Sequence, residues 1–348
     1  MRRRAFLTAA GWTVTATAGC LGRASPESYT IPPALDDPPT QVYVPTHGTG
    51  LDVVGTADAG PFRLGLLYSY PDRFWEVTGR KRYLRAVEPE DSIHLMATAW
   101  DPKTGIVLPE VGLTVEVARD GELVAQEAVY AMLSQRLGFH YGDNFALPGD
   151  GRYEVTVRVG GLQLRRTGGF EGRFTDPAST TFTLDYRRAE RDGLSTTRPD
   201  TAGAPGAMEP ANALGIPNAE APTSLPGESL GRATVDDTVF AFALLSGDEA
   251  ERFDADRYLV VSPRTPYNGM LLPSMGLRVR IDRAGGSVET ILTRTVDSEL
   301  GYHYGTVVPA LDSGDTLVVE TLTPPQVARH EGYETAFIEL PALRHPVP

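Results

Sequence analysis

Short apolar runs separated by turn residues cover most of the chain from residue 41 onward. In several runs apolar and polar residues alternate, which predicts strands with one buried and one exposed face. Clusters of turn residues, such as Asp101–Gly105 and Pro148–Gly151, separate the runs. The predicted strands include Phe62–Tyr68, Ser92–Trp100, Leu113–Val117, Arg152–Val159 and Thr181–Tyr186. Strands at this spacing, without clear helices, predict an all-β protein built of immunoglobulin-like antiparallel β-sandwiches.

The same pattern occurs twice along the chain. The pentapeptide Gly138-Phe139-His140-Tyr141-Gly142 returns 163 residues later as Gly301-Tyr302-His303-Tyr304-Gly305. The strand Leu108–Val117 is likewise matched by Leu272–Ile281. Two sandwich domains are therefore predicted, at residues 41–187 and 233–342, the second being a degenerate copy of the first. Residues 188–232 are rich in Pro, Gly and Ala, and predict a linker because they offer little apolar surface to bury.

The N-terminus has the features of a targeting segment. Arg2-Arg3-Arg4-Ala5-Phe6-Leu7 has the form of a twin-arginine signal, and the apolar run after it is too short to span a bilayer. Thr17-Ala18-Gly19-Cys20 resembles a lipobox, with a plain cleaved signal as the alternative. We therefore expect residues 1–19 to be removed, Cys20 to carry lipid and residues 20–40 to form a tether. The protein would then sit on the extracellular face of the cell membrane, attached through this lipid only.

Charge and residue content narrow the possible functions. The net charge is −13, and an acidic surface of this kind repels nucleic acid. The chain has a single cysteine, which excludes intramolecular disulfides and thiolate metal clusters. No nucleophile motif, phosphate-binding glycine loop or helical His-Glu-x-x-His motif is present. We therefore expect a binding protein and not an enzyme.

The remaining chemistry is a set of imidazole and thioether groups in the first copy. His94 and Met96 are two residues apart on a predicted strand and so share one face, and Met132 precedes His140 by eight residues. Two imidazoles with thioethers and no thiolate suit copper, especially Cu(I), better than magnesium or calcium. Iron or zinc would also want a carboxylate, which Asp143 or Asp72 could supply. The alternative is that these side chains are ordinary core residues.

The first copy, over residues 42–187, resembles a bacterial periplasmic iron-transport accessory family. That family binds copper and iron beside a high-affinity iron permease. Its marks are His-Leu-Glu on a strand, then a Met one loop before Asp-Gly-Pro-His-Tyr-Gly-x-Asn. This chain has His94-Leu95-Met96, Met132 and Gly138–Asn144 in the same order. The resemblance implies immunoglobulin-like sandwiches, usually in homodimers with the metal near the dimer interface.

By this resemblance His94, Met132 and His140 are metal ligands. Met96 stands in the place of the family's glutamate, and we expect Met96 or, more weakly, Asp143 to assist. The second copy has Tyr258 in place of His94 and Thr295 in place of Met132. A single imidazole does not hold a metal well, so we expect His303 to be structural.

These features predict a lipoprotein that binds copper or iron and supports metal uptake or its transfer to a membrane transporter or permease. The alternative is a structural or adhesion protein of immunoglobulin-like domains with a degenerate site and no metal.

Overall fold

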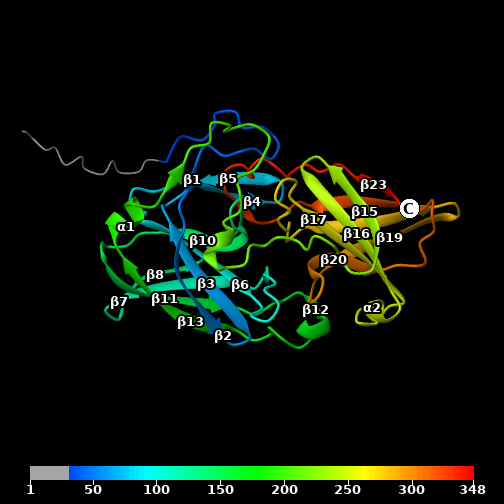
Figure 1. Ribbon diagram of the computed structural model, residues 1–348, viewed down its shortest axis with the longest axis horizontal. Coiled ribbons are helices and arrows are strands. Elements are labelled where there is room, and N and C mark those ends of the chain that lie inside the picture. Colours follow the sequence, from blue (N-terminus) through cyan, green and yellow to red (C-terminus); the bar gives the residue numbers. More distant parts are fainter. Residues whose placement is uncertain (1–30) are drawn as a thin grey trace, which may run out of the picture. The chain divides into compact units, whose positions relative to one another are not determined.

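Almost all regular structure in the computed structural model is β-strand, which confirms the predicted all-β, immunoglobulin-like class (Figure 1). The structure describes residues 31–348. The predicted signal segment, the lipobox with Cys20 and the first half of the predicted tether lie outside the described residues. Within residues 31–348 no helix is long and apolar enough to cross a membrane.

The first copy is a sandwich of two antiparallel sheets. In the larger sheet five strands run in the order β2-β3-β6-β10-β9, and in the smaller sheet four strands run in the order β13-β11-β7-β8. The larger sheet contains β2 (Asp52–Ala59), β3 (Phe62–Ser69), β6 (Ile93–Trp100), β10 (Gly138–Phe145) and β9 (Tyr130–Ser134). The smaller contains β13 (Ala178–Tyr186), β11 (Gly151–Val159), β7 (Leu113–Arg119) and β8 (Glu122–Ala128).

The second copy repeats this order strand for strand. Its sheets run β15-β16-β17-β20-β19 and β23-β21-β18-β19, so that one long strand, β19, replaces β8 and β9. The first half of β19 pairs with β18 and its second half with β20. The strands are β15 (Glu228–Val235), β16 (Thr238–Ser246), β17 (Arg257–Arg264), β18 (Gly276–Arg283), β19 (Gly286–Asp297), β20 (Gly301–Val307), β21 (Thr316–Thr323) and β23 (Leu343–Pro346). Because β23 pairs with β21, the second sandwich extends beyond residue 342.

Alternation along the strands explains the sandwich. In β11, Tyr153, Val155 and Val157 are fully buried, whereas Arg152 and Glu154, on either side of Tyr153, are exposed. Side chains of a strand point alternately to its two faces, so this sequence buries one face and leaves the other in water. One continuous hydrophobic cluster includes buried side chains from both copies.

A segment from the end of the chain joins the sheet of the first copy. Strand β22 (Ala328–Arg329) lies between β9, which it pairs in parallel, and β4 (Phe74–Thr78), which it pairs in antiparallel fashion. Strand β5 (Lys81–Arg85) completes this edge of the sheet. After β21 the chain therefore leaves the second sandwich, contributes to the first, and returns as β23. No feature of the sequence predicted this excursion.

The predicted linker is tied to its surroundings by backbone hydrogen bonds. Val44 N–H donates to the Ala204 carbonyl (2.9 Å) and Ala211 N–H to the Arg136 carbonyl (2.8 Å). Strand β15 already begins at Glu228, inside the predicted linker. The short elements outside the sandwiches are β1 (Gly48–Thr49), β14 (Thr196–Thr197), β12 (Arg165–Thr167), α1 (Arg188–Asp192), α2 (Asp248–Glu251) and the 3-10 turns Gly168–Phe170 and Asn212–Leu214.

Arg329 holds the segment around β22 in place, and this role gives the first prediction. Its side chain is fully buried, donates to the Tyr333, Ala336 and Pro325 carbonyls, and lies over the Phe337 ring. Arg329→Met should lower the free energy of unfolding by roughly 3 kcal/mol, because it leaves buried carbonyls without donors. Denaturant titration measures this. The exposed ion pair of Arg344 provides the control, since Arg344→Met should cost less than about 1 kcal/mol. Equal effects of the two substitutions would contradict a fastening role for Arg329.

Candidate metal centre

Three neighbouring strands place the predicted ligands on one face of the larger sheet. His94 and Met96 on β6 lie opposite Asn144 and Gly142 on β10. His140 on the same strand lies opposite Met132 on β9. Because side chains alternate along a strand, all of these positions share one face. The register of the sheet thus brings His94, Met96, Met132 and His140 together, as the sequence pattern predicted for the first two.

Asp143, the weaker candidate ligand, lies one residue from both Gly142 and Asn144 on β10 and pairs with Leu95. Alternation places it on the opposite face of the sheet from His140. The structure does not bring it to the imidazole groups.

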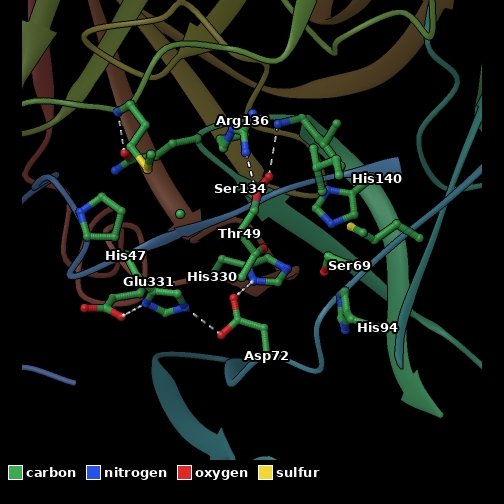
Figure 2. Close-up of a pocket in the computed structure, with 17 residues that line it drawn as sticks. His47, Thr49, Ser69, Asp72, His94, Ser134, Arg136, His140, His330 and Glu331 are labelled. Carbon is green, nitrogen blue, oxygen red and sulfur yellow. Dashed lines mark hydrogen bonds and ion pairs between the residues drawn. The ribbon is translucent and has the colours of Figure 1, made fainter. Parts of the chain in front are cut away.

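The third imidazole is that of His330, which directly follows β22 in the segment that joins the first copy from the end of the chain. Ala328 on β22 pairs with Met132, and the His330 backbone N–H donates to the Leu133 carbonyl (3.1 Å). The His330 ring stacks on His140 with centroids 5.5 Å apart and meets the edge of His94 at 5.3 Å. One ring nitrogen from each of His94, His140 and His330 lies within 4.8 Å of the others. Figure 2 shows the three rings around one space. His330 was absent from the predicted ligands.

A contact at the Nδ1 atom holds each imidazole in its orientation. The His140 Nδ1–H donates to the Gly138 carbonyl (3.1 Å), and the His94 Nδ1–H donates to the Asn144 side-chain oxygen (2.8 Å). His330 Nδ1 lies 3.6 Å from an Asp72 carboxylate oxygen. These contacts leave the Nε2 atoms as the metal-facing nitrogens. All three Nε2 atoms are buried and have no hydrogen-bond partner among the described residues.

Burial also keeps two of the imidazoles neutral. The His94 side chain is wholly buried, and this burial, with a smaller contribution from the nearby His330, lowers its pKa to about 4. Burial lowers the pKa of His140 well below its ordinary value of 6.5, again with a contribution from His330. Charged imidazolium is disfavoured in an apolar interior. At neutral pH both rings therefore present lone pairs, the form that a metal ligand requires.

The thioethers border the same space. A Cβ added at Gly142 would lie 3.0 Å from His94 Nε2 and 3.2 Å from the Met132 sulfur, so both atoms adjoin the surface of that glycine. Met132 is fully buried and packs against Phe74 and Ala328. Met96 lines the cavity described below. The absence of a side chain at Gly142 is what leaves room for these donors.

A cavity of about 70 Å³ extends from the imidazoles toward a second group of charged residues (Figure 2). His47 Nε2 lies 3.2 Å from Asp72 and its Nδ1 lies 3.5 Å from Glu331. Burial opposes protonation of His47, but its two carboxylate partners raise the His47 pKa to about 9. Arg73 pairs with Glu331 as well. The two carboxylates are thus already neutralised by two cations.

The second copy preserves the pentapeptide but not the site. His303 Nδ1–H donates to the Gly301 carbonyl (3.0 Å), just as His140 does to Gly138. Its Nε2, however, faces the Tyr258 hydroxyl at 3.4 Å, and the Tyr258 ring stacks on Phe253. Thr295 lies opposite His303, where Met132 lies opposite His140. No other imidazole or carboxylate joins His303 in a cluster within residues 31–348.

The depressed pKa values predict how the stability of the metal-free protein depends on pH. Histidines of the unfolded chain take up a proton near pH 6.5, whereas His94 and His303 stay neutral in the folded chain down to about 4. Between these values the unfolded state binds more protons, so the free energy of unfolding should fall as pH drops from about 6.5 to about 4. Denaturant titrations across this window measure the slope. His94→Gln should reduce it, and an unchanged slope would contradict a buried neutral His94.

Part of the chain is similar to solved structures of two bacterial proteins that were determined with copper. A copper-bound variant of FetP from uropathogenic Escherichia coli strain F11 is 20% identical, with a TM-score of 0.33, over 39% of this chain and 97% of that chain. The copper-reconstituted P19 protein from Campylobacter jejuni is 19% identical, with a TM-score of 0.31, over 39% of this chain and 96% of that chain. No curated protein matches the sequence.

A family profile matches both copies of the sandwich. The profile covers residues 76–183 and 223–345, which together make up more than half of the chain. Its two segments correspond to the strands from β4 to β13 and from β15 to β23. The chain therefore belongs to the family described as Domain of unknown function (DUF7350).

Proposed function

We propose that this protein binds one copper ion, as Cu(I), through His94, His140 and His330, with Met132 and Met96 as additional soft donors. The observation that carries the proposal is that one ring nitrogen of each histidine lies within 4.8 Å of the others, while all three Nε2 atoms are buried without a hydrogen-bond partner among residues 31–348. A buried polar atom without a hydrogen bond costs on the order of 1–3 kcal/mol. A metal ion is the ligand that satisfies three such lone pairs at once.

The donor set favours Cu(I) over harder ions. The three imidazoles supply intermediate nitrogen donors, the methionines supply soft sulfur, and no carboxylate belongs to the triad. An iron centre of this type commonly includes an anionic oxygen ligand, and Asp143 faces away. Three histidines with an open position also suit zinc, so the choice of metal is part of the test below.

The cellular role that fits this site is metal capture and transfer rather than catalysis. Among residues 31–348, the carboxylates that line the cavity beside the triad are Asp72 and Glu331, and both are paired with His47. With the predicted twin-arginine signal and the lipid on Cys20, the protein would hold copper at the extracellular face of the membrane. A membrane transporter or permease would receive the ion, and iron uptake would be the process that it supports.

The ligand set predicts the metal stoichiometry. The full chain should bind one equivalent of Cu(I), and His94→Gln, His140→Gln or His330→Gln should each remove or strongly weaken binding. His303→Gln, in the equivalent loop of the second copy, should bind one equivalent as before and provides the matched control. Titration against a chromophoric Cu(I) chelator, with metal analysis after dialysis, measures both quantities.

Three results of this titration would count against the proposal. Unchanged binding by His330→Gln would exclude the triad as the site. Two equivalents per chain would contradict an inactive second copy. Stronger retention of Zn(II) than of Cu(I) in a direct competition would replace copper by zinc.

The hydrogen bond behind His94 gives a further prediction. Asn144→Leu removes the acceptor of the Nδ1–H and also the two hydrogen bonds between Asn144 and the Asp72 backbone, while every proposed ligand residue is kept, and should weaken Cu(I) binding roughly 10- to 100-fold. The neighbouring Asp143→Asn alters the other face of the same strand and should leave the affinity unchanged. Competition titrations of the two variants test this. Equal affinities for both variants would show that orientation of His94 has no part in binding.

A further inference from the structure

The segment predicted to be a linker carries a methionine to the metal cavity. The Met208 backbone N–H donates to the Gln135 side-chain oxygen (2.8 Å), and three residues later Ala211 N–H donates to the Arg136 carbonyl (2.8 Å). Gln135 in turn donates to the Tyr43 carbonyl (2.7 Å), so the segment is held by a buried side chain of the first copy. These bonds fix Met208 at the wall of the cavity, of which it is a lining residue.

The thioether of Met208 occupies a hollow formed by a glycine. A Cβ added at Gly48 would lie 2.4 Å from the Met208 methyl carbon and 2.9 Å from its sulfur. Gly48 also lines the cavity. A side chain at this position would therefore push the thioether out of its place, which means that the sulfur depends on a glycine for its position beside the cavity.

The cavity joins this sulfur to the metal centre. Its lining includes Met208 and Gly48 together with Met96 and the three histidines of the triad. Met208 is partly exposed, whereas His94 and His140 are almost completely buried. A partly exposed methionine and the buried donors of the candidate centre thus line one small space.

We infer that Met208 is the first protein ligand met by incoming Cu(I), which then passes along the cavity to Met96 and the imidazoles. This inference rests on the proposed function. Thioether sulfur is a soft, neutral donor that binds Cu(I) but has little affinity for hard ions. A weak first ligand lets the ion shed its carrier outside the buried site and move on by exchange of one ligand at a time. Met208 thus sets the rate and the selectivity of loading, while the triad sets the final affinity.

Loading kinetics test this role. The full chain is mixed in a stopped-flow instrument with the Cu(I) complex of a chromophoric chelator, and transfer is followed by loss of the chelate colour. Met208→Leu keeps the side-chain volume but removes the sulfur, and should slow transfer several-fold. The final stoichiometry and the affinity at equilibrium should equal those of the unchanged protein. Ag(I), a redox-inert soft ion, should show the same slowing, whereas Zn(II) loading should keep its rate.

Two further variants separate the role of the sulfur from a general disturbance. Gly48→Ala keeps the methionine but displaces its thioether, and should slow Cu(I) loading as Met208→Leu does. Met275→Leu removes a buried thioether of the second copy and should leave loading unchanged.

The possible failures are distinguishable. If the unchanged protein takes up no Cu(I), the proposed function itself is wrong and the inference falls with it. If it binds one equivalent and Met208→Leu loads at the same rate, only the role of Met208 is overturned. A lower equilibrium affinity of Met208→Leu would likewise overturn it, because Met208 would then be a permanent ligand.

Discussion

The candidate site depends on the pairing of two residues, Ala328 and Arg329, with the sheet of the first copy. This two-residue strand gains few hydrogen bonds of its own, so the segment relies on its buried anchor. Arg329 donates to three carbonyls of its own segment, and Glu331 pairs with Arg73, the residue before β4. His330 lies between Arg329 and Glu331 in the sequence, so the contacts of both neighbours hold it in place. Without the excursion the first copy would hold two imidazoles and thioethers, a much weaker ligand set.

The same C-terminal segment bears on whether a second subunit must supply part of the candidate site. The resemblance noted in the sequence implies homodimers with the metal near their interface. In this chain a segment that follows the second copy reaches the first and supplies the third imidazole in cis. A partner subunit is therefore not needed to complete the triad. The entropic cost of closing a loop rises only slowly with the length of the loop. A residue far along the chain can therefore join the site at little extra cost.

Local pattern predicted those parts of the site that sequence spacing controls. Strand alternation places His94 and Met96 on one face, and the repeated pentapeptide marks the strand that carries His140. The same alternation already separates Asp143 from His140. The two residues are three positions apart, and an odd spacing along a strand places side chains on opposite faces. Asp143 could thus have been set aside from the sequence.

His330 could not have been found in this way. It lies 190 residues after His140, and the strand before it has only two residues, too few for any periodic pattern. The contacts that hold the predicted linker could not be placed from the sequence for a related reason. Its composition predicts little burial, but its position is set by a few backbone donors and by the Gln135 side chain, which composition does not reveal.

Comparison of the two copies shows what turns a shared loop into a site. In both, the first glycine of the pentapeptide has a positive φ, 65° at Gly138 and 67° at Gly301, and its carbonyl accepts the Nδ1–H of the histidine two residues later. This local geometry points Nε2 of His140 and of His303 into the sandwich. In the second copy the Tyr258 hydroxyl lies within reach of that nitrogen. In the first copy His94 stands where Tyr258 would, and offers another lone pair instead of a hydroxyl.

Buried nitrogens without a hydrogen-bond partner lower the stability of a folded protein unless a ligand binds them. Each buried acceptor left without a donor destabilises the fold by on the order of 1–3 kcal/mol. The second copy avoids this cost with one tyrosine, which shows that the scaffold has an available solution. The first copy instead gathers three such atoms, keeps at least two of them neutral by burial, and orients each from behind. If the proposed metal binds there, it would offset the cost of these atoms, and binding would then be coupled to the stability of the first copy.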